Sequence, residues 1–584
     1  MKKSLILITS FMSISLCGCF NKGTVPAEKV NLKTVNDVLC SLQEDGVKNT
    51  QQISYEVVEE EELLPYFTLE GYFDLLNDYV KDGWTITTGK SVGGFLVTVS
   101  DPENNPYYVA NISTAGRYFQ GSGDMSYAFT TEKDLDKSSM YAQYRGGGNL
   151  MGDITNLKKF YYTDLDFTIY SKDGETYFPL SLLEINFASM TSVHHLYNYK
   201  RLVQYTDAKQ LDTDKYLVDG QSISAYEEMN KYVQDVMKDV MPLYLRKDRQ
   251  ASFLFIMENL YGLKQTRNIS SMKEYFEKQA FFADFLSENS EKRREAYCKT
   301  FELLNDGHTA IRDSETYPWY KGTINSYGPK IVNMINLSKT LTPARIEAGL
   351  TPGQVYYSTD GKLAFFTFDS FTFTYDAYEE DGTTLKTSLS DYNSEDFDSY
   401  FYIARLLKEI KEKGGVEDIV IDISTNGGGT IGVLVKILAL MSNDNMGTIY
   451  AYSDVMHAAQ SMYCSVDSNG DGEYDLKDCY GSDFAFHLLT SSFSFSCANL
   501  FPFAAKYDGI ASIIGERSGG GECAIQEAYL PSGEHFYHSS NMHIGWYAGS
   551  FIGDEGGTPV DIPVEYADFY NLDRLQTIIN DNEL

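Results

Sequence analysis

In the C-terminal half of the chain, short apolar runs alternate with segments of helical period. Residues 362–368 and 418–423 are apolar runs of strand length, and the helical segment between them stops at Gly414-Gly415. A glycine-rich turn follows the second run and opens an apolar helix from Thr430. Strands that alternate with helices build α/β domains, so we expect an α/β fold for this part of the chain.

The chain is strongly acidic. Its 584 residues include 48 Lys and Arg against 82 Asp and Glu, which gives a formal net charge of −34. Such a field repels nucleic acid, so we expect no nucleic-acid partner. Hydrophobic residues make up 43% of the chain, enough to bury sizeable cores. At about 150 residues per domain, the length allows about three to four domains.

The N-terminus has the form of an export signal. Two lysines precede an apolar stretch that is short for a membrane span and ends in Leu-Cys-Gly-Cys at Cys19. This ending resembles the lipobox of bacterial lipoproteins, which implies a signal peptide over residues 1–18 and a lipid on Cys19. We therefore expect an extracytoplasmic protein, lipid-anchored to a bacterial cell membrane. The alternative is an ordinary signal peptide with small residues at its cleavage site.

Composition divides the remainder into three parts. Residues 19–190 begin with a tether and continue as a Tyr-, Thr-, Val- and Gly-rich sequence with alternating runs, which favours a β-rich accessory domain. Residues 191–310 become helical, with a capping-box pattern from Ser224 to Glu227, and end in a loop that carries a histidine. Residues 311–584 hold the α/β core.

The cysteines leave several pairings open. In an oxidising compartment the six that follow the signal could form disulfides in many combinations, and sequence does not choose among them. Two pairs are close to features of interest: Cys464 with Cys479, and Cys497 with Cys523. For the second pair, two buried free thiols are the alternative.

Two turns in the α/β core have a form that catalytic sites use. Residues 426–429 read Asn-Gly-Gly-Gly between a strand and a helix, where backbone N–H groups bind an anion such as a phosphate or an oxyanion. The missing Gly-Lys-Ser/Thr ending argues against a nucleotide. Residues 491–499 read Ser-Ser-Phe-Ser-Phe-Ser-Cys-Ala-Asn at another strand-to-helix turn, which suits an exposed nucleophile. Each turn also has an ordinary explanation as tight packing, and a lone loop histidine such as His308 is more often structural.

Together these segments resemble the C-terminal processing, or tail-specific, protease family of serine peptidases. The resemblance rests on the glycine turn, the Phe-Ser-Phe-Ser-Cys-Ala-Asn run and the Ile-Ile-Gly-Glu-Arg-Ser-Gly-Gly-Gly run from Ile513. It covers residues 300–584 and implies a crotonase-like spiral of β-β-α units. It also implies Ser496 as the nucleophile and an oxyanion hole of N–H groups near Gly428 and at Cys497.

One departure from the family changes the expected base. Members with a Ser/Lys pair carry a lysine in the glycine-rich turn, where this chain has Gly521. Because a serine hydroxyl needs a base to become a nucleophile, another residue must supply it here. The chain is more similar to the tricorn-like branch, which uses an upstream histidine; His308 stands at that place. The branch implies an acid near the C-terminus, for which we favour Glu555 over Asp554. It has a serine before the histidine, where this chain has Gly307.

These features lead us to expect a secreted, lipid-anchored serine endopeptidase that acts on peptides or unfolded protein tails. Ser496 would attack the carbonyl carbon and His308 would take the proton, with no cofactor needed for the chemistry. The alternative from another class is a catalytically silent binding or scaffold protein that retains the protease fold. A third, weaker alternative is a surface adhesin built around the N-terminal domain.

An acidic loop suggests a structural Ca²⁺ site outside the catalytic set. Residues 467–478 place oxygen-bearing side chains at loop positions typical of EF-hand and dockerin loops, with a glycine at position 6 for the sharp turn. The expected ligands are Asp467, Asn469, Asp471, Glu473, Asp475 and Asp478. A polar surface turn without metal is the alternative.

If this loop binds Ca²⁺, added Ca²⁺ will raise the melting temperature of the wild-type chain, because a ligand that binds only the folded state stabilises it. Asp467→Ala combined with Asp471→Ala will abolish the rise. Differential scanning calorimetry with Ca²⁺ and with a chelator measures both. Superimposable wild-type curves in the two conditions would rule the site out.

Overall fold

The computed structural model describes most of the chain after its first 29 residues. The predicted signal segment and Cys19 lie outside the described residues. These residues are 30–43, 46–123, 125–129, 142–146, 151–152, 157–206, 211, 214–218, 221–238, 240–311, 327–373 and 398–582.

A six-stranded sheet forms the centre of the α/β core, as the apolar runs predict. Its order is β18-β19-β20-β23-β24-β28, and all neighbours after β19 pair in parallel. The strands are β18 (Tyr356–Tyr357), β19 (Leu363–Thr367), β20 (Asp418–Asp422), β23 (Ala485–Thr490), β24 (Ala511–Gly515) and β28 (Ile562–Pro563).

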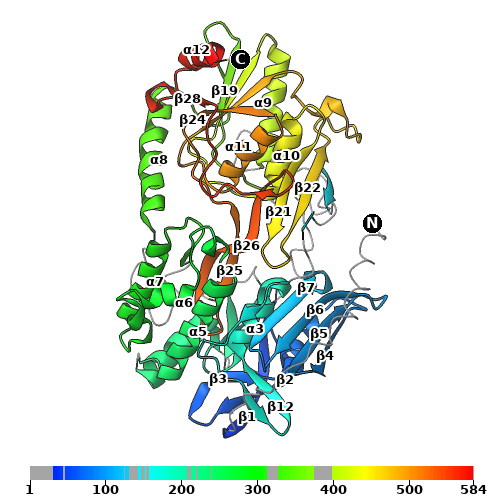
Figure 1. The fold of residues 1–584 in the computed structure, drawn as a ribbon, viewed down its shortest axis with the longest axis vertical. Helices are drawn as coiled ribbons and strands as arrows, with labels where there is room; N and C mark the ends of the chain where they lie inside the picture. Colours follow the sequence, from blue (N-terminus) through cyan, green and yellow to red (C-terminus); the bar gives the residue numbers. More distant parts are fainter. Residues whose placement is uncertain are drawn as a thin grey trace.

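Helices cover both faces of this sheet, which explains why its strands are continuous apolar runs. On β20, Ile419 and Ile421 enter one core and Val420 enters another, because strand side chains alternate in direction. One face packs under α9 (Ser399–Lys413), α10 (Ile431–Met441) and α11 (Cys497–Tyr507); the other packs under α8 (Pro329–Glu347) and α12 (Leu572–Asn582) (Figure 1).

Because the central strands are parallel, their carboxyl ends lie along one edge of the sheet. The turns after β20, β23 and β24 therefore come together there, and they are the three glycine- and serine-rich segments recognised in the sequence. In open α/β sheets, ligands bind at this edge.

A second, antiparallel sheet joins the core to the rest of the molecule. Its path is β17-β26-β21-β22-β8, with β25 and β27 beside β26 and β9 beside β22. The strands are β8 (Ala142–Gly146), β9 (Met151–Gly152), β17 (Ala310–Ile311), β21 (Gly447–Ser453), β22 (Ala458–Val466), β25 (Cys523–Tyr529), β26 (His535–Tyr547) and β27 (Phe551–Ile552). Strands β8 and β9 come from the segment predicted as an accessory domain, so hydrogen bonding crosses that predicted boundary.

The N-terminal region is rich in β-structure, as its composition predicts. A seven-stranded sheet runs β11-β12-β3-β2-β1-β14-β13, and a five-stranded sheet runs β10-β7-β6-β5-β4. The first contains β1 (Leu32–Gln43), β2 (Gly46–Val58), β3 (Glu61–Phe67), β11 (Tyr170–Lys172), β12 (Glu175–Pro179), β13 (Val193–Tyr197) and β14 (Leu202–Thr206). The second contains β4 (Thr85–Ser91), β5 (Gly94–Ser100), β6 (Pro106–Ser113), β7 (Tyr118–Gly123) and β10 (Phe160–Tyr161).

The sequence analysis assigned residues 191–310 to a helical segment, but β13 and β14 at its start complete the N-terminal sheet. Strand β14 pairs in parallel with β1, where Cys40 faces Val203. Tertiary pairing over this distance along the chain has no local sequence signal. A two-stranded ribbon, β15 (Lys215–Val218) and β16 (Gln221–Ser224), follows.

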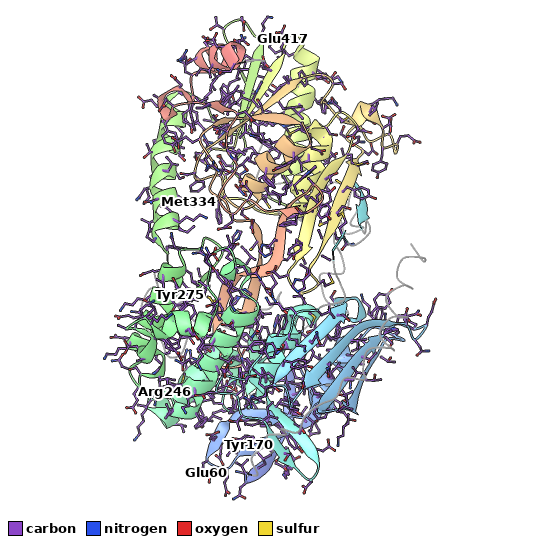
Figure 2. The ribbon with its side chains drawn as sticks, in the orientation of Figure 1. Glu60, Tyr170, Arg246, Tyr275, Met334 and Glu417 are labelled. Atoms are coloured by element: carbon purple, nitrogen blue, oxygen red, sulfur yellow. The ribbon has the colours of Figure 1, made fainter. Side chains whose placement is uncertain are left out.

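The run of helices predicted for this segment begins after the ribbon. The predicted capping box is present: Ser224 accepts the N–H of Glu227, whose side chain accepts the N–H of Ser224. The helices are α4 (Ala225–Tyr232), α5 (Leu243–Asn259), α6 (Met272–Glu277) and α7 (Ser290–Leu304), and α3 (Leu180–Thr191) packs beside them. Figure 2 labels Glu417, which precedes β20, at the top of the view, and Tyr275 on α6 and Arg246 on α5 successively below it.

Strands β25 and β26 run from the α/β core into the helical part (Figure 1). Asn541 on β26 donates to the carbonyl of Asn259 at 3.0 Å, and Phe536 packs against Phe253 with ring centroids 5.7 Å apart. The described helices include none that is long and apolar enough to cross a membrane. All six cysteines within the described part are buried free thiols, so neither suggested disulfide forms.

A buried ion pair fixes α8 to the sheet. Arg345 donates to Asp369 at 2.7 Å and to Thr425 at 3.1 Å, and it lies 3.4 Å from Asp422 at the end of β20. Asp422 is fully buried, and burial raises its pKa while the Arg345 guanidinium acts to lower it. The Arg345 charge therefore supports the strand end that leads into the glycine turn.

Arg345→Met should destabilise the fold by about 3–5 kcal/mol, because it leaves the buried carboxylate of Asp422 without a compensating charge. Urea unfolding followed by circular dichroism measures this. Lys362→Met is the matched control, because the Lys362–Glu417 pair is exposed on both sides, and it should change the midpoint little. Equal midpoints for the two variants would contradict the role of Arg345.

Candidate active site

Ser496 occupies a strained turn between β23 and α11. Its backbone has φ 58° and ψ −124°, in a region that residues with a side chain rarely adopt. Its N–H donates to the carbonyl of Gly520 at 2.9 Å, which ties the turn to the next strand's loop. Ser496 is half-buried, and its hydroxyl has no hydrogen-bond partner among the residues that the structure describes. This geometry is that of a nucleophile held at a strand-to-helix turn.

The glycine turn lies directly against Ser496. A Cβ added at Gly428 would meet Ser496 Cβ at 2.7 Å and Cys497 N at 3.0 Å, so only glycine allows this approach. The N–H of Gly428 donates to the Asn426 side chain at 2.8 Å. Within the described chain, the N–H groups of Gly429 and Cys497 have no partner. The amides available to bind an oxyanion here are therefore those of Gly429 and Cys497. Gly428, which the sequence analysis placed in the oxyanion hole, instead packs directly against Ser496.

The His308 loop is fixed by Asp306. The Asp306 carboxylate accepts the N–H of His308 at 3.0 Å and the hydroxyl of Ser539 on β26 at 2.8 Å, and it also bonds Thr309. Asn305 ends α7 in the left-handed conformation, with φ 47°. This places the loop beside β26, where β17 adds a short pairing.

Phe495, the residue before Ser496, packs against this loop. The His308 and Phe495 ring centroids are 4.7 Å apart. A Cβ at Gly307 would lie 2.4 Å from the Phe495 ring, which explains why glycine precedes the histidine here. A Cβ at Gly521 would lie 2.7 Å from the same ring and 3.1 Å from Ser496 N. The structure therefore brings the His308 loop and Gly521 against the same aromatic ring.

His308 is buried, and neither ring nitrogen makes a hydrogen bond of standard geometry with a described residue, although the Cys523 backbone lies close enough to favour the charged ring. No hydrogen bond joins it to Ser496, a contact that often tightens only when substrate binds. Burial lowers the pKa of His308; the Asp306 carboxylate opposes this, and Lys330 lowers the pKa further. A neutral imidazole near pH 7 is the form that accepts a proton.

Glu555 lies on the far side of the same site. Its carboxylate accepts the N–H groups of Gly521 at 3.2 Å and Glu522 at 3.1 Å, and it pairs with Lys330 at 3.5 Å. Burial raises the pKa of Glu555, and Lys330 offsets part of that rise. Asp554 instead bonds Thr558, away from these groups. The sequence left two acids open, and Glu555 is the one whose carboxylate contacts the site. It does so by pairing with Lys330, not with His308.

Lys330 is the site residue that the sequence analysis missed. Its ammonium lies 4.9 Å from the centre of the Phe495 ring. Its backbone N–H donates to the side-chain oxygen of Asn305 at 2.7 Å. It stands in the first turn of α8, where no motif marks it. Lys506, the lysine nearest to Ser496 in sequence, instead binds Asp561 at the surface.

Asn499 on α11 was also missed, and it holds two loops together. Its side-chain oxygen accepts from the Ser518 hydroxyl at 2.6 Å and from Thr558 N–H at 3.3 Å, and its amide donates to the carbonyl of Asp554. It stands one turn after Ser496, so its position in the Ser-Cys-Ala-Asn run was its only signal.

The predicted calcium loop lies outside this site, between β22 and a short 3-10 turn (Leu476–Asp478). Its carboxylates accept the loop's own N–H groups: Asp467 from Gly470 at 2.7 Å, and Asp478 from Ser468 at 2.9 Å. Asp475 pairs with Lys477. Among the described residues, one group of three acidic, His or Cys side chains is close enough to share a metal ion, and it is not in this loop. Calcium binding at residues 467–478 therefore stays a prediction.

Comparisons with known proteins agree with the resemblance seen in the sequence. The family model "Peptidase family S41" matches residues 388–553. This stretch contains the glycine turn and Ser496; it begins after His308 and ends before Glu555. No curated protein matches.

Three solved structures with similar folds are compared by their sequence identity, their TM-score, and the shares of this chain and of the other chain that are covered. The photosystem II D1 C-terminal processing protease is 17% identical with a TM-score of 0.26, over 38% of this chain and 45% of that one. A lipoprotein from Streptococcus agalactiae is 12% identical with a TM-score of 0.32, over 55% and 92%. Mature CPAF complexed with lactacystin is 11% identical with a TM-score of 0.34, over 57% and 96%. These likenesses are too weak to carry a functional conclusion.

Removal of the Lys330 charge should raise the pKa of His308, because that charge disfavours the imidazolium. NMR titration of labelled histidine, assigned with His308→Gln, will show a higher midpoint in Lys330→Met than in wild type. Lys339→Met, an exposed lysine further along α8, is the control and should leave the midpoint unchanged. An unchanged or lowered midpoint in Lys330→Met would mean that the two groups do not interact.

Proposed function

Since residues 388–553 belong to peptidase family S41 and mark this chain as a serine-type peptidase, we propose that it is an endopeptidase in which Ser496 is the nucleophile and His308 the general base. The observation that carries the proposal is the strained Ser496 turn, with the free N–H groups of Gly429 and Cys497 beside it. Peptides or unfolded protein tails are the proposed substrates.

The proposed chemistry follows from these positions. Ser496 Oγ attacks the carbonyl carbon of the peptide bond while His308 accepts the hydroxyl proton. The N–H groups of Gly429 and Cys497 bind the oxyanion, and His308 then passes its proton to the leaving amine. Lys330 and the Asp306 carboxylate act on His308 from two sides, so its pKa is set by charges that the fold places there.

His308 must approach the Ser496 hydroxyl for this chemistry. Phe495 lies against the histidine and adjoins the serine in sequence, so its position decides the separation between base and nucleophile. We propose that substrate binding shifts the Phe495 ring and brings the two groups into hydrogen-bond contact.

The rival proposal is a binding or scaffold protein without catalysis. The unpartnered ring nitrogens of His308 and the absence of a Ser496–His308 hydrogen bond among the described residues are the observations in its favour. Whether Ser496 reacts decides between the two.

A fluorophosphonate probe should label the wild-type chain and not Ser496→Ala. His308→Ala should slow labelling and peptide hydrolysis by at least about a hundredfold, the usual scale for loss of a general base. Ser492→Ala, an exposed serine in the same turn, is the matched control and should react like wild type. No labelling of wild type would favour the scaffold protein, and full activity of His308→Ala would end the assignment of the base.

The dependence of the hydrolysis rate on pH tests the protonation state of His308. His308 works as a base only when neutral, and its pKa is lowered by burial. Hydrolysis should therefore be lost as pH falls through a midpoint below the ordinary value of about 6.5.

For location, we propose a chain anchored through lipid on Cys19 outside the cytoplasm of a bacterium. The support is the lipobox-like ending at Cys19. Metabolic labelling with a fatty-acid analogue should mark wild type and not Cys19→Ser. Release of wild type into the medium without detergent would contradict the anchor.

A further inference from the structure

A group of three side chains behind the active site has the composition and spacing of a metal centre. Glu522, Cys523 and His543 each offer one ligand atom, and these atoms all lie within 4.8 Å of one another. Cys523 begins β25 and His543 faces it on β26, so the strand register itself brings the two together. Cys523 and His543 are buried, and the Glu522 side chain is 9% exposed.

The sulfur–nitrogen separation suits a tetrahedral ion. Cys523 Sγ lies 3.6 Å from His543 Nδ1. Two ligands at about 2.3 Å (sulfur) and about 2.0 Å (nitrogen) from Zn²⁺ are about 3.5 Å apart in tetrahedral geometry. Glu522 Oε1 lies 2.8 Å from His543 Nδ1, so its carboxylate would move outward by about half an ångström to admit the ion.

The other face of the imidazole is already held as a metal ligand requires. His543 Nε2 lies 3.2 Å from Asp454 Oδ2. Without metal, both ring nitrogens face carboxylates, so Nδ1 also carries a proton toward Glu522. A bound ion would displace that proton to solvent, while Asp454 keeps accepting the Nε2–H and so fixes the tautomer. Thiolate, imidazole and carboxylate together are a donor set for Zn²⁺ rather than for Ca²⁺ or Mg²⁺.

We propose that Glu522, Cys523 and His543 bind one Zn²⁺, with Asp454 as the group that orients the imidazole. The fourth position takes water. The site is separate from the predicted calcium loop, and the backbone of Cys523 adjoins the His308 ring.

The ion would also fix part of the active site, a consequence that rests on the proposed function. Glu522 Oε2 accepts the N–H of Glu555 at 2.9 Å, and Glu522 N–H donates back to Glu555 at 3.1 Å. A metal on Oε1 leaves both bonds in place and holds Glu522 still. Glu555, which pairs with Lys330, is thereby held at the base of the site.

The test uses the purified full-length chain with the Ser496→Ala substitution, so that metal binding is measured without proteolysis and does not depend on it. In excess Ca²⁺, which occupies sites made of carboxylates alone, the metal-free protein should take up one equivalent of Zn²⁺ by elemental analysis. Co²⁺ in its place should give a thiolate-to-cobalt charge-transfer band. Cys523→Ser should lose the band, and Asp454→Asn should weaken Zn²⁺ affinity by about 10–100-fold.

Cys298→Ser, another buried free thiol, is the matched control and should keep both the stoichiometry and the band. Circular dichroism checks that each variant folds. Absence of stoichiometric Zn²⁺ and of the band in the parent protein would overturn the proposal and leave His543 as an imidazolium between Glu522 and Asp454. A band that persists in Cys523→Ser would also overturn it.

Discussion

The active site depends on the contact between the backbone of one turn and the side chain of another. Gly428 approaches Ser496 so closely that a single added carbon would overlap it. That contact is available only because β20 and β23 are neighbouring parallel strands, so their following turns leave the sheet side by side. The amides of Gly429 and Cys497, which have no partner in the described chain, therefore lie next to this contact.

The aromatic ring of Phe495 is the second organising element. It separates the histidine loop, which comes from the end of the helical segment, from the glycine turn after β24. Two glycines, Gly307 and Gly521, leave it the space it fills. Lys330 approaches the same ring. The Phe495 side chain, next to Ser496 in sequence, therefore adjoins both His308 and Lys330.

Several charged groups stabilise the elements around the candidate site. Arg345 neutralises the end of β20, Asp306 fixes the histidine loop, and Lys330 and Glu555 pair across the site. Lys330 is half-buried beside this loop, and its charge lowers the pKa of His308.

The sequence by itself determined the α/β core, the strand-to-helix turns at residues 426–429 and 491–499, and the presence of glycine rather than lysine at position 521. These depend on local periodicity and on short runs of residues, and such signals survive without knowledge of the fold. Tertiary structure alone decided that Lys330 reaches the site, that β13 and β14 belong to the N-terminal sheet, and that Cys523 meets His543. Each of these contacts joins segments that are distant in sequence, and their partners are chosen by sheet register and packing rather than by any local pattern.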